Sequence, residues 1–354
     1  ASGAGGATVR AAVVHGAEDL RIEEVPEPEL APDEVLVRNA YCGVCGSDIA
    51  MFFDPPSIGI DFSRPHPVTG TSLPQIIGHE FSGTVVAVGS EVGEIKAGDD
   101  VVAFPMIHCG ECSACEAGLH RICRNLGTHG YTSKSGGLAD YSAVPEDKLF
   151  RLPEGVPLEL GALTEPLAVS WHAVRRSGIE PGQRALIIGG GPIGIGLTLA
   201  LRAFGVGEVH LSETSDSRRA IVEKMGIASL ADPGDLAQLG EVDVVFDAAG
   251  HAAALDRALG GVKPQGTAVI VAIYKKPLQL TGAAIALKEL RIVGSLAYEA
   301  RDFADVIEAM SRGMVETEDW VETGVFAELE ETIRALARGE RMKVLVDMRA
   351  EAAA

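Results

Sequence analysis

The spacing of apolar residues changes near the middle of the chain. In the first part, alternating runs at 9–14, 34–40 and 84–89 predict strands, and glycines and prolines separate short runs of this kind up to about residue 144. This pattern indicates a β-rich, barrel-like domain. Residues 54–74 interrupt it with several prolines and little periodicity. Because loops of this length are usually functional or disordered, we expect this one to border the substrate site.

The second part alternates between strands and helices, which is typical of an α/β fold with a doubly wound parallel sheet. The predicted strands are 184–188, 208–211, 242–247, 267–273 and 290–293. The predicted helices are 166–176, a run that follows Gly194 and ends at about Phe204, and 252–259. Two amphipathic helices, 302–311 and 329–338, then precede a last strand at 343–346, and we assign this tail back to the first domain. The predicted domains are 7–158, 159–297 and the returning segment 298–354.

A glycine-rich turn stands between the first strand and helix of the second part. Gly189, Gly191 and Gly194 fit the G-x-G-x-x-G pattern. Glu213 comes at the end of the next predicted strand, 19 residues after Gly194. Glycines let the backbone approach a pyrophosphate at a helix N-terminus, and an acidic residue at this distance accepts hydrogen bonds from a ribose. The alternative is a tight turn without a ligand. The cofactor-binding candidates are Gly189, Gly191, Pro192, Ile193, Gly194, Glu213 and Arg218. Since Glu213 would repel a 2′-phosphate, we expect NAD rather than NADP.

Four of the six cysteines lie within 15 residues, and the other two are Cys42 and Cys45. Cys109, Cys112, Cys115 and Cys123 have the x2, x2, x7 spacing of a closed thiolate site for a structural Zn²⁺. An iron–sulfur cluster and unliganded thiols are the alternatives, but the bacterial cluster pattern has a different spacing.

A second set of metal ligands is spread along the chain. Cys45, His79 and Glu165 are the first choices for a catalytic zinc site, which needs three protein ligands and one open position. Glu80 follows His79 directly, and neighbours on a strand point to opposite faces, so we expect Glu80 to act as an exchanging or outer carboxylate. Polar surface is the plainer interpretation of a single His-Glu pair.

An open zinc site and a dinucleotide site in one chain indicate hydride transfer between an alcohol and a carbonyl. Ser47, two residues after Cys45, is placed to start the proton relay, and a simple turn residue is the alternative interpretation. Asp48 is a candidate to orient the ring of His79. The predicted catalytic residues are Cys45, Ser47, His79, Glu80 and Glu165.

Net charge limits the partners of this chain. With 30 Lys and Arg against 50 Asp and Glu, the formal charge is −20, which disfavours nucleic acid and anionic membranes. The apolar run at 185–201 contains the glycine turn, so we interpret it as a strand and helix rather than a membrane span. Clustered cysteines and the lack of a secretory segment at the first residues lead us to expect a cytoplasmic protein.

Taken together, these motifs resemble the zinc-dependent medium-chain alcohol dehydrogenases over nearly the whole chain. The family motifs are those at 43–48, 78–80, 109–123, 165–167 and 189–194, and those at 65–70, 165–172 and 287–298 are most similar to the (R,R)-2,3-butanediol dehydrogenases. The resemblance implies a GroES-like catalytic domain, a Rossmann domain, and dimers or tetramers joined through Rossmann edge strands. It also implies a small alcohol or ketone substrate, with 2,3-butanediol and acetoin as the leading pair.

The same resemblance leaves alternatives open. A sorbitol- or threonine-type dehydrogenase shares every zinc and NAD motif, and some relatives that lost zinc bind a dinucleotide without turnover. One position departs from the family pattern, because Ala50 stands where many members have a histidine that passes the proton to solvent. Water or another group such as His66 would then complete the relay.

Overall fold

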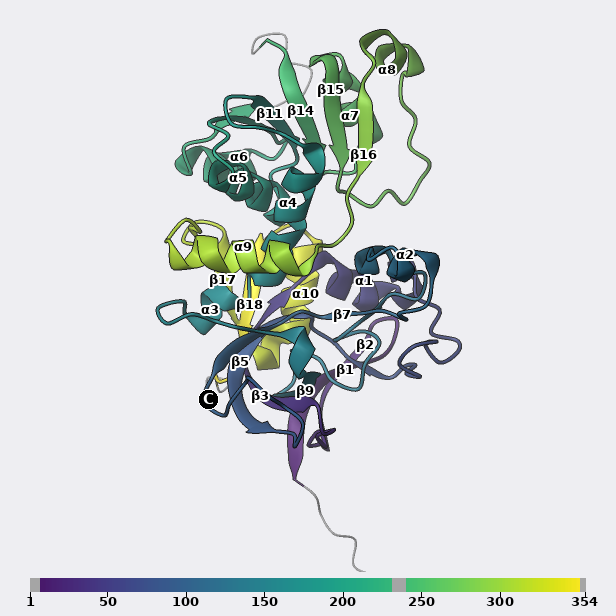
Figure 1. The fold of residues 1–354 in the computed structure, drawn as a ribbon, viewed down its shortest axis with the longest axis vertical. Helices are drawn as coiled ribbons and strands as arrows, with labels where there is room; N and C mark the ends of the chain where they lie inside the picture. The colour runs from purple at the N-terminus through teal and green to yellow at the C-terminus, as the bar shows by residue number, and fades with distance from the viewer. Residues whose placement is uncertain (1–6, 231–239, 351–354) are drawn as a thin grey trace, which may run out of the picture. The chain divides into compact units, whose positions relative to one another are not determined.

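The computed structural model describes residues 7–230 and 240–350 of the chain (Figure 1). They belong to two units, one formed by 1–165 with 321–354 and the other by 166–320. The predicted boundaries were 158/159 and 297/298, whereas the structure divides at 165/166 and 320/321. The chain therefore returns to the first unit with Val321.

The first unit is built mainly from strands. Its strands are β1 (Thr8–Gly16), β2 (Asp19–Pro26), β3 (Glu34–Val44), β4 (Gln75–Ile76), β5 (Glu80–Val88), β6 (Asp100–Ala103), β7 (Met106–Ile107), β8 (Gly127–Thr128), β9 (Tyr141–Pro145), β10 (Leu149–Arg151), β17 (Val321–Val325) and β18 (Lys343–Asp347). Its helices are short: α1 (Gly46–Phe53), α2 (Ser113–Glu116), α3 (Leu158–Gly161), α10 (Leu329–Ala337), and the 3-10 turns η1 (Pro55–Ile58), η2 (His120–Ile122), η3 (Glu146–Lys148) and η5 (Phe326–Glu328).

One large mixed sheet organises this unit. Its strand order is β10-β6-β5-β3-β18-β17, with β9 also paired to β3, and a smaller sheet has the order β2-β1-β4. The long strand β3 alternates apolar residues toward the core, where Val35 and Val37 pack with Phe81 and Leu138. The predicted β-rich first domain thus has its core between β3, β5 and the segments that cover them.

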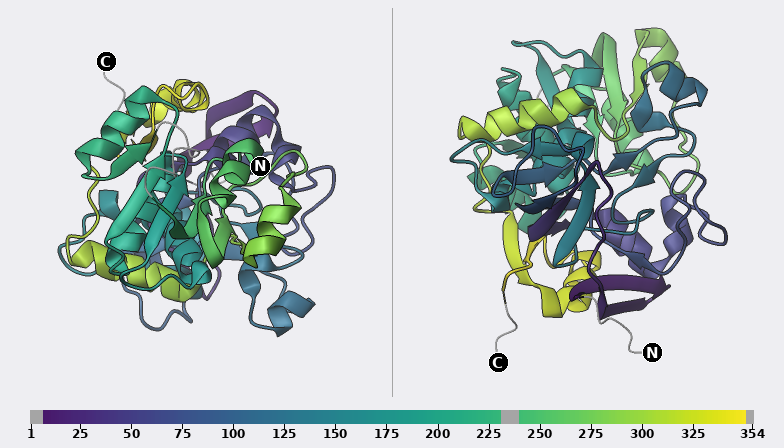
Figure 2. Two further views of the ribbon diagram at one scale, coloured as in Figure 1. Left: turned by 90° about the horizontal axis from the view of Figure 1, so that it is seen from above. Right: turned by 60° about the horizontal axis from the view of Figure 1, so that its bottom comes forward.

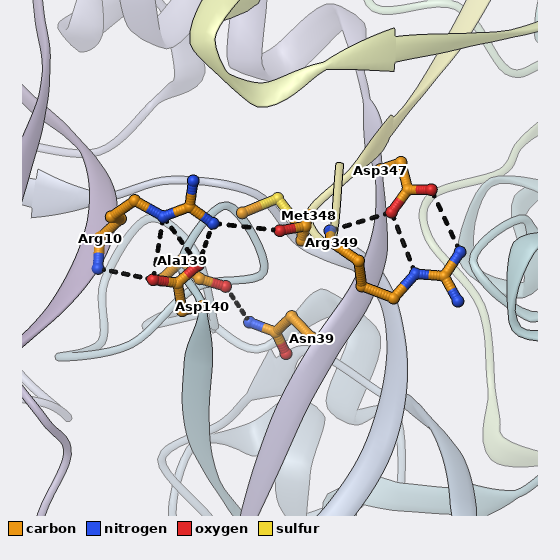
Figure 3. A network of polar contacts seen from close by, with 7 residues as sticks. All are labelled: Arg10, Asn39, Ala139, Asp140, Asp347, Met348 and Arg349. Carbon is orange, nitrogen blue, oxygen red and sulfur yellow. Dashed lines mark hydrogen bonds and ion pairs between the residues drawn. The ribbon is translucent and has the colours of Figure 1, made fainter. Parts of the chain in front are cut away.

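The C-terminal strands join a strand from the early part of the chain in this sheet. Strand β18 runs antiparallel to β3, with Val346 opposite Cys42, and Figure 2 shows the yellow C-terminal strands beside the earlier strands of the unit. A polar network fastens the same region (Figure 3). Arg10 pairs with Asp140 at 2.7 Å and donates to the carbonyl oxygen of Met348 at 3.3 Å, while Arg349 holds Asp347 at 3.0 Å.

The second unit contains a parallel sheet between helices. The strands are β11 (Arg184–Ile188), β12 (Glu208–Ser212), β13 (Ala228–Leu230), β14 (Val242–Asp247), β15 (Val262–Ile270) and β16 (Arg291–Gly294). The helices are α5 (Pro192–Ala203), α6 (Asp216–Lys224), α7 (Ala252–Leu259), α8 (Gly282–Lys288) and α9 (Ala300–Ser311), preceded by α4 (Thr164–Ser177), which begins in the first unit.

The strand order is β13-β12-β11-β14-β15-β16. From β11 the chain adds β12 and β13 on one side, and it then returns to add β14, β15 and β16 on the other side, so the order reverses between β11 and β14. Since crossovers between parallel strands are right-handed, α5 and α6 are expected on one face of the sheet and α7 and α8 on the other; Figure 1 labels these helices around the strands. This is the doubly wound Rossmann arrangement, whose ligands bind at the carboxyl ends of the strands where the order reverses. The predicted α/β fold class is confirmed.

Two elements near functional residues were not predicted. Helix α1 begins directly after Cys45 and carries Ser47, and strand β17 pairs in parallel with β18. Among the residues described, no helix combines the length and apolar character that crossing a membrane requires.

Candidate active site

The structure brings three of the predicted zinc ligands together in the first unit. Ligand atoms of Cys45, His79 and Glu80 all lie within 4.8 Å of one another. Cys45 follows the end of β3 and precedes α1, whereas Glu80 is the first residue of β5. Because β3 and β5 are antiparallel and Gly43 lies opposite Glu80, their pairing carries the thiol and the carboxylate to one point.

The backbone around Gly78 explains how His79 and Glu80 share one cluster. Gly78 has φ +97°, and His79 precedes the strand, so the strand alternation that was expected to separate the two side chains does not apply. A side chain at Gly78 is excluded, because its Cβ would lie 2.7 Å from both the Cys42 sulfur and the Leu138 nitrogen.

Glu80 is completely buried and has a cationic partner that the sequence analysis missed. Its Oε2 is ion-paired with Lys343, the first residue of β18, and its Oε1 is a buried oxygen without a hydrogen-bond partner in the described residues. Lys343 also donates to the carbonyl oxygen of Val44 at 3.1 Å. No local signal marks a lysine that is 263 residues away in sequence.

Negative groups surround His79. Asp48 accepts a 2.8 Å hydrogen bond from the Cys45 backbone, and its other oxygen lies 3.7 Å from His79 Nδ1. Burial disfavours the charged imidazole, but Asp48 and Cys45 favour it more strongly, so the pKa of His79 lies well above its ordinary value. The same anionic surroundings favour a bound metal cation.

Two hydroxyl groups lie beside the metal-ligand cluster. The Ser47 hydroxyl is 2.6 Å from the phenol oxygen of Tyr131, which is itself 2.6 Å from His79 Nδ1 and 3.4 Å from His79 Nε2. Burial, followed by the charges of Asp48 and Cys45, raises the pKa of Tyr131 well above its ordinary value, so the phenol stays protonated. Tyr131 was not identified from the sequence, where it is one tyrosine in a stretch rich in glycine and serine.

Glu165 occupies the first turn of α4 and is 7% exposed. It is outside the group of three described residues whose ligand atoms lie within 4.8 Å of one another. Burial lowers the pKa of Lys343, but Glu80, Cys45 and, with a smaller effect, Glu165 raise it above its ordinary value. The charge of Glu165 also adds to the raised pKa of Tyr131, after burial and the charges of Asp48 and Cys45. Its role as the third protein ligand therefore stays a prediction, with Glu80 the carboxylate nearest to Cys45 and His79.

The four clustered cysteines also form a compact group. Their sulfur atoms lie within 4.8 Å of one another, with 3.4 Å between Cys123 and Cys109 and 3.6 Å between Cys112 and Cys115. Backbone N–H groups of Arg124 and Cys115 lower the pKa of Cys112 to about 6, which favours the thiolate that zinc binds. All four are free thiols rather than disulfides, so the donor set fits a closed tetrahedral zinc site.

The glycine turn of the second unit is open at the helix start. Gly189 follows β11 and has φ +100°. Gly191 is the N-cap of α5, and because glycine has no side chain, it does not cap the first N–H groups of the helix. A Cβ at Gly191 would meet nothing within 4 Å, whereas one at Gly194 would lie 1.9 Å from the Gly189 carbonyl oxygen. Gly194 thus permits the close turn, and the open helix start, which includes Pro192 and Ile193, fits a pyrophosphate.

Glu213 follows β12 at the same edge of the sheet. Its two oxygens accept 2.9 Å hydrogen bonds from the backbone N–H groups of Gly190 and Ser215. Arg218 approaches Glu213 at 3.9 Å, and Arg219 donates to the Glu213 carbonyl oxygen at 2.7 Å. The carboxylate is therefore fixed beside the glycine turn, where it suits a ribose better than a phosphate.

A cysteine–histidine–carboxylate cluster and a dinucleotide-type turn in one chain define the class of zinc-dependent dehydrogenases. Two family models match this class: an alcohol dehydrogenase GroES-like domain over residues 31–154, and a zinc-binding dehydrogenase model over residues 192–312.

Individual relatives agree with the family models. The (R,R)-butanediol dehydrogenase of Bacillus subtilis is 34% identical over 96% of this chain and 99% of its own length. That of Neisseria gonorrhoeae is 34% identical over 88% of this chain and 91% of its own length. The crystal structure of 2R,3R-butanediol dehydrogenase from Bacillus subtilis has a TM-score of 0.88 at 33% identity, with 96% of this chain and 99% of that chain covered.

The chain belongs to the zinc-dependent medium-chain alcohol dehydrogenase family. The predicted family, enzyme class and cofactors, which are zinc and NAD, are thereby confirmed. The individual roles assigned to the site residues stay predictions that rest on the geometry above.

Proposed function

We propose that this enzyme interconverts 2,3-butanediol and acetoin with NAD. The observation that carries the proposal is the cluster of Cys45, His79 and Glu80 with the Ser47 hydroxyl close by, in a chain about one-third identical to two butanediol dehydrogenases. The two alignments cover 88% and 96% of this chain.

The side chains divide the work between holding the metal and handling the proton. Cys45, His79 and a carboxylate from Glu80 or Glu165 would hold the catalytic zinc, and the four-cysteine group would hold the structural one. A zinc ion held there would supply the positive charge that polarises the oxygen of an alcohol or ketone, and NAD would supply the hydride acceptor or donor for the carbon that bears this oxygen. Ser47 is the hydroxyl that would hold the proton of the reacting oxygen.

The proton must leave Ser47 without the histidine that Ala50 replaces. The ring of His66 is already engaged by other groups, because it contacts Thr69 of its own loop at 3.3 Å and the carbonyl oxygen of Leu126, 60 residues further along, at 3.4 Å. Water next to Ser47 is then the simplest acceptor of the proton. This step predicts that Ala50→His accelerates oxidation of the alcohol whenever proton release limits the rate.

Turnover measurements on a panel of alcohols test the proposal. The purified enzyme should oxidise 2,3-butanediol with NAD at a higher kcat/KM than ethanol, sorbitol or threonine, and should contain two zinc ions per chain. Chiral analysis of the acetoin and diol formed would identify the stereoisomer. A clear preference for sorbitol or threonine would replace the butanediol assignment with a polyol or amino-alcohol one.

We also propose that the enzyme is a cytoplasmic homo-oligomer. Strand β16 is an edge strand of the parallel sheet, and its residue Ile292 is 37% exposed. Nearby in sequence, Leu287 and Leu296 are 87% and 45% exposed, so an apolar edge is available to a second copy. Light scattering should give a dimer or tetramer, and Ile292→Lys should weaken it. Six free cysteines suit a reducing compartment, which cell fractionation would test.

A further inference from the structure

The phenol of Tyr131 is a buried polar group whose contacts are directed at the predicted active site. The side chain lies in the core of the first unit and is 5% exposed. Its oxygen contacts the Ser47 hydroxyl at 2.6 Å and the ring of His79 at 2.6 Å and 3.4 Å. Tyrosine oxygens that are buried in this way usually have a defined hydrogen-bonding role.

The loop that carries Tyr131 is held against the segment that carries His79. Gly130 has φ +89°, and a Cβ there would lie 2.2 Å from the Gly78 carbonyl oxygen. Further along the loop, the Gly137 N–H donates to the same carbonyl at 2.7 Å. Backbone contacts on both sides of Tyr131 therefore fix its phenol relative to His79, independently of the hydrogen bonds that the phenol makes.

The distances place this phenol beside the predicted metal-ligand cluster. Its oxygen is within 3.4 Å of both ring nitrogens of His79, and His79 is one of the residues that would hold the ion. Ser47 is the hydroxyl already assigned to the reacting oxygen. A second hydroxyl one hydrogen-bond length away is not required to oxidise a simple alcohol.

We propose that Tyr131 determines specificity by binding the second oxygen of a vicinal diol or hydroxy ketone. The inference rests on the proposed function and names the residue that would recognise the substrate class. Two oxygens on adjacent carbons in a gauche arrangement are separated by roughly one hydrogen-bond length, which matches the spacing of the Ser47 and Tyr131 oxygens. Ser47 would bind the reacting oxygen, and Tyr131 would bind its neighbour.

Tyr131→Phe tests this assignment because it removes the oxygen and keeps the ring. The kcat/KM for 2,3-butanediol should fall on the order of tenfold to a hundredfold, since the second substrate oxygen loses its partner in a buried site. The kcat/KM for 2-butanol, which has no second oxygen, should change far less. Tyr141→Phe, on strand β9, is the matched control and should leave both values unchanged.

A binding measurement separates recognition from turnover. In the cobalt-substituted enzyme with NADH present, an alcohol cannot react, and its binding is followed by the visible absorption of the cobalt. The diol should bind wild type at least tenfold more tightly than 2-butanol, and Tyr131→Phe should remove most of that difference at unchanged metal content. If Tyr131→Phe does not fold, the wild-type comparison alone decides, and equal binding of the two ligands overturns the proposal.

The outcomes also distinguish the two proposals. If wild type prefers the diol and Tyr131→Phe keeps the same preference, the role of Tyr131 is overturned and the proposed function stands. Wild type that does not oxidise the diol overturns both. A decrease that is equal for the diol and for 2-butanol shows a structural effect on Ser47 or His79 and refutes recognition of a second oxygen.

Discussion

Replacing Lys343 by Met would isolate the charge of Glu80 in the protein interior. Glu80 is fully buried and Lys343 is 2% exposed, and the two are ion-paired. Burial opposes the charge of Lys343, but Glu80, Cys45 and Glu165 favour it more strongly, and the pKa of Lys343 is raised. Breaking a buried pair by removing one partner costs about 3–5 kcal/mol of unfolding free energy. We expect Lys343→Met to lose an amount of this order when the metal has been removed by a chelator.

Zinc should reduce that loss, because a bound cation next to Glu80 supplies a second positive charge. The assay is urea unfolding of wild type, Lys343→Met, Glu80→Gln and the double variant, with chelator and with zinc. In chelator, the double variant should be more stable than Lys343→Met, giving a coupling energy of about 1–3 kcal/mol in the cycle. Arg21→Met, which removes an exposed ion pair with Asp19, is the control and should cause no resolvable change.

The pH dependence provides an independent check on the same pair. The pKa of Lys343 is raised in the folded protein, so its contribution is complete below the unfolded pKa and is lost as the pH rises through the folded value. At alkaline pH, wild type should therefore lose the free energy of unfolding that the charged Lys343 contributes, and Lys343→Met should not show this loss. Equal urea midpoints for wild type and Lys343→Met in chelator, or strictly additive effects in the cycle, would refute the reasoning.

Three further outcomes follow from the other sites. Glu213→Ala should narrow the preference for NAD, mainly by admitting NADP, because a carboxylate and a phosphate about 4 Å apart repel by about 4 kcal/mol at a dielectric constant of 20; wild type that uses NADP as efficiently as NAD would contradict this. Cys45→Ser should abolish turnover and keep the fold, whereas Cys112→Ser should lower thermal stability and zinc content; one zinc or none in fresh wild type would show that the two-site interpretation is wrong. Burial lowers the pKa of His129 to about 4, so wild type should lose stability as the pH falls from about 6.5 toward 4, and His129→Gln should lose less; parallel urea midpoints of the two proteins across this range would exclude the effect.

Local features of the sequence were sufficient for several elements of the Rossmann unit, although β13 and α8 were not predicted. Its strands β11 and β14 and its helix α7 begin and end at the predicted residues, because each is an apolar run bounded by turn residues. The glycine turn was also recognisable, since Gly189 and Gly194 meet a steric need within a few residues of each other. The four-cysteine spacing is local in the same sense.

The polar partners of the active site were not recognisable, because they depend on contacts between distant segments. Tyr131 reaches Ser47 across 84 residues, and Lys343 reaches Glu80 across 263 residues. A lysine at the start of a strand and a tyrosine in a glycine-rich loop look like surface residues in sequence. The pairing of β3 with both β5 and β18 brings Lys343 to Glu80, and the backbone contact between Gly137 and Gly78 holds the loop of Tyr131 beside His79.

His79 and Glu80 show how one backbone angle can reverse an inference from periodicity. Alternation along a strand would place the imidazole and carboxylate on opposite faces, and that argument made Glu80 a secondary candidate. The strand begins only at Glu80, and the positive φ of Gly78 changes the chain direction just before His79, so the side chains of His79 and Glu80 reach the same cluster. Since a Cβ at Gly78 would also collide with Cys42 and Leu138, substitution there would displace His79 from Cys45 and Glu80. The geometry of the metal cluster therefore depends on a glycine that has no ligand atom of its own.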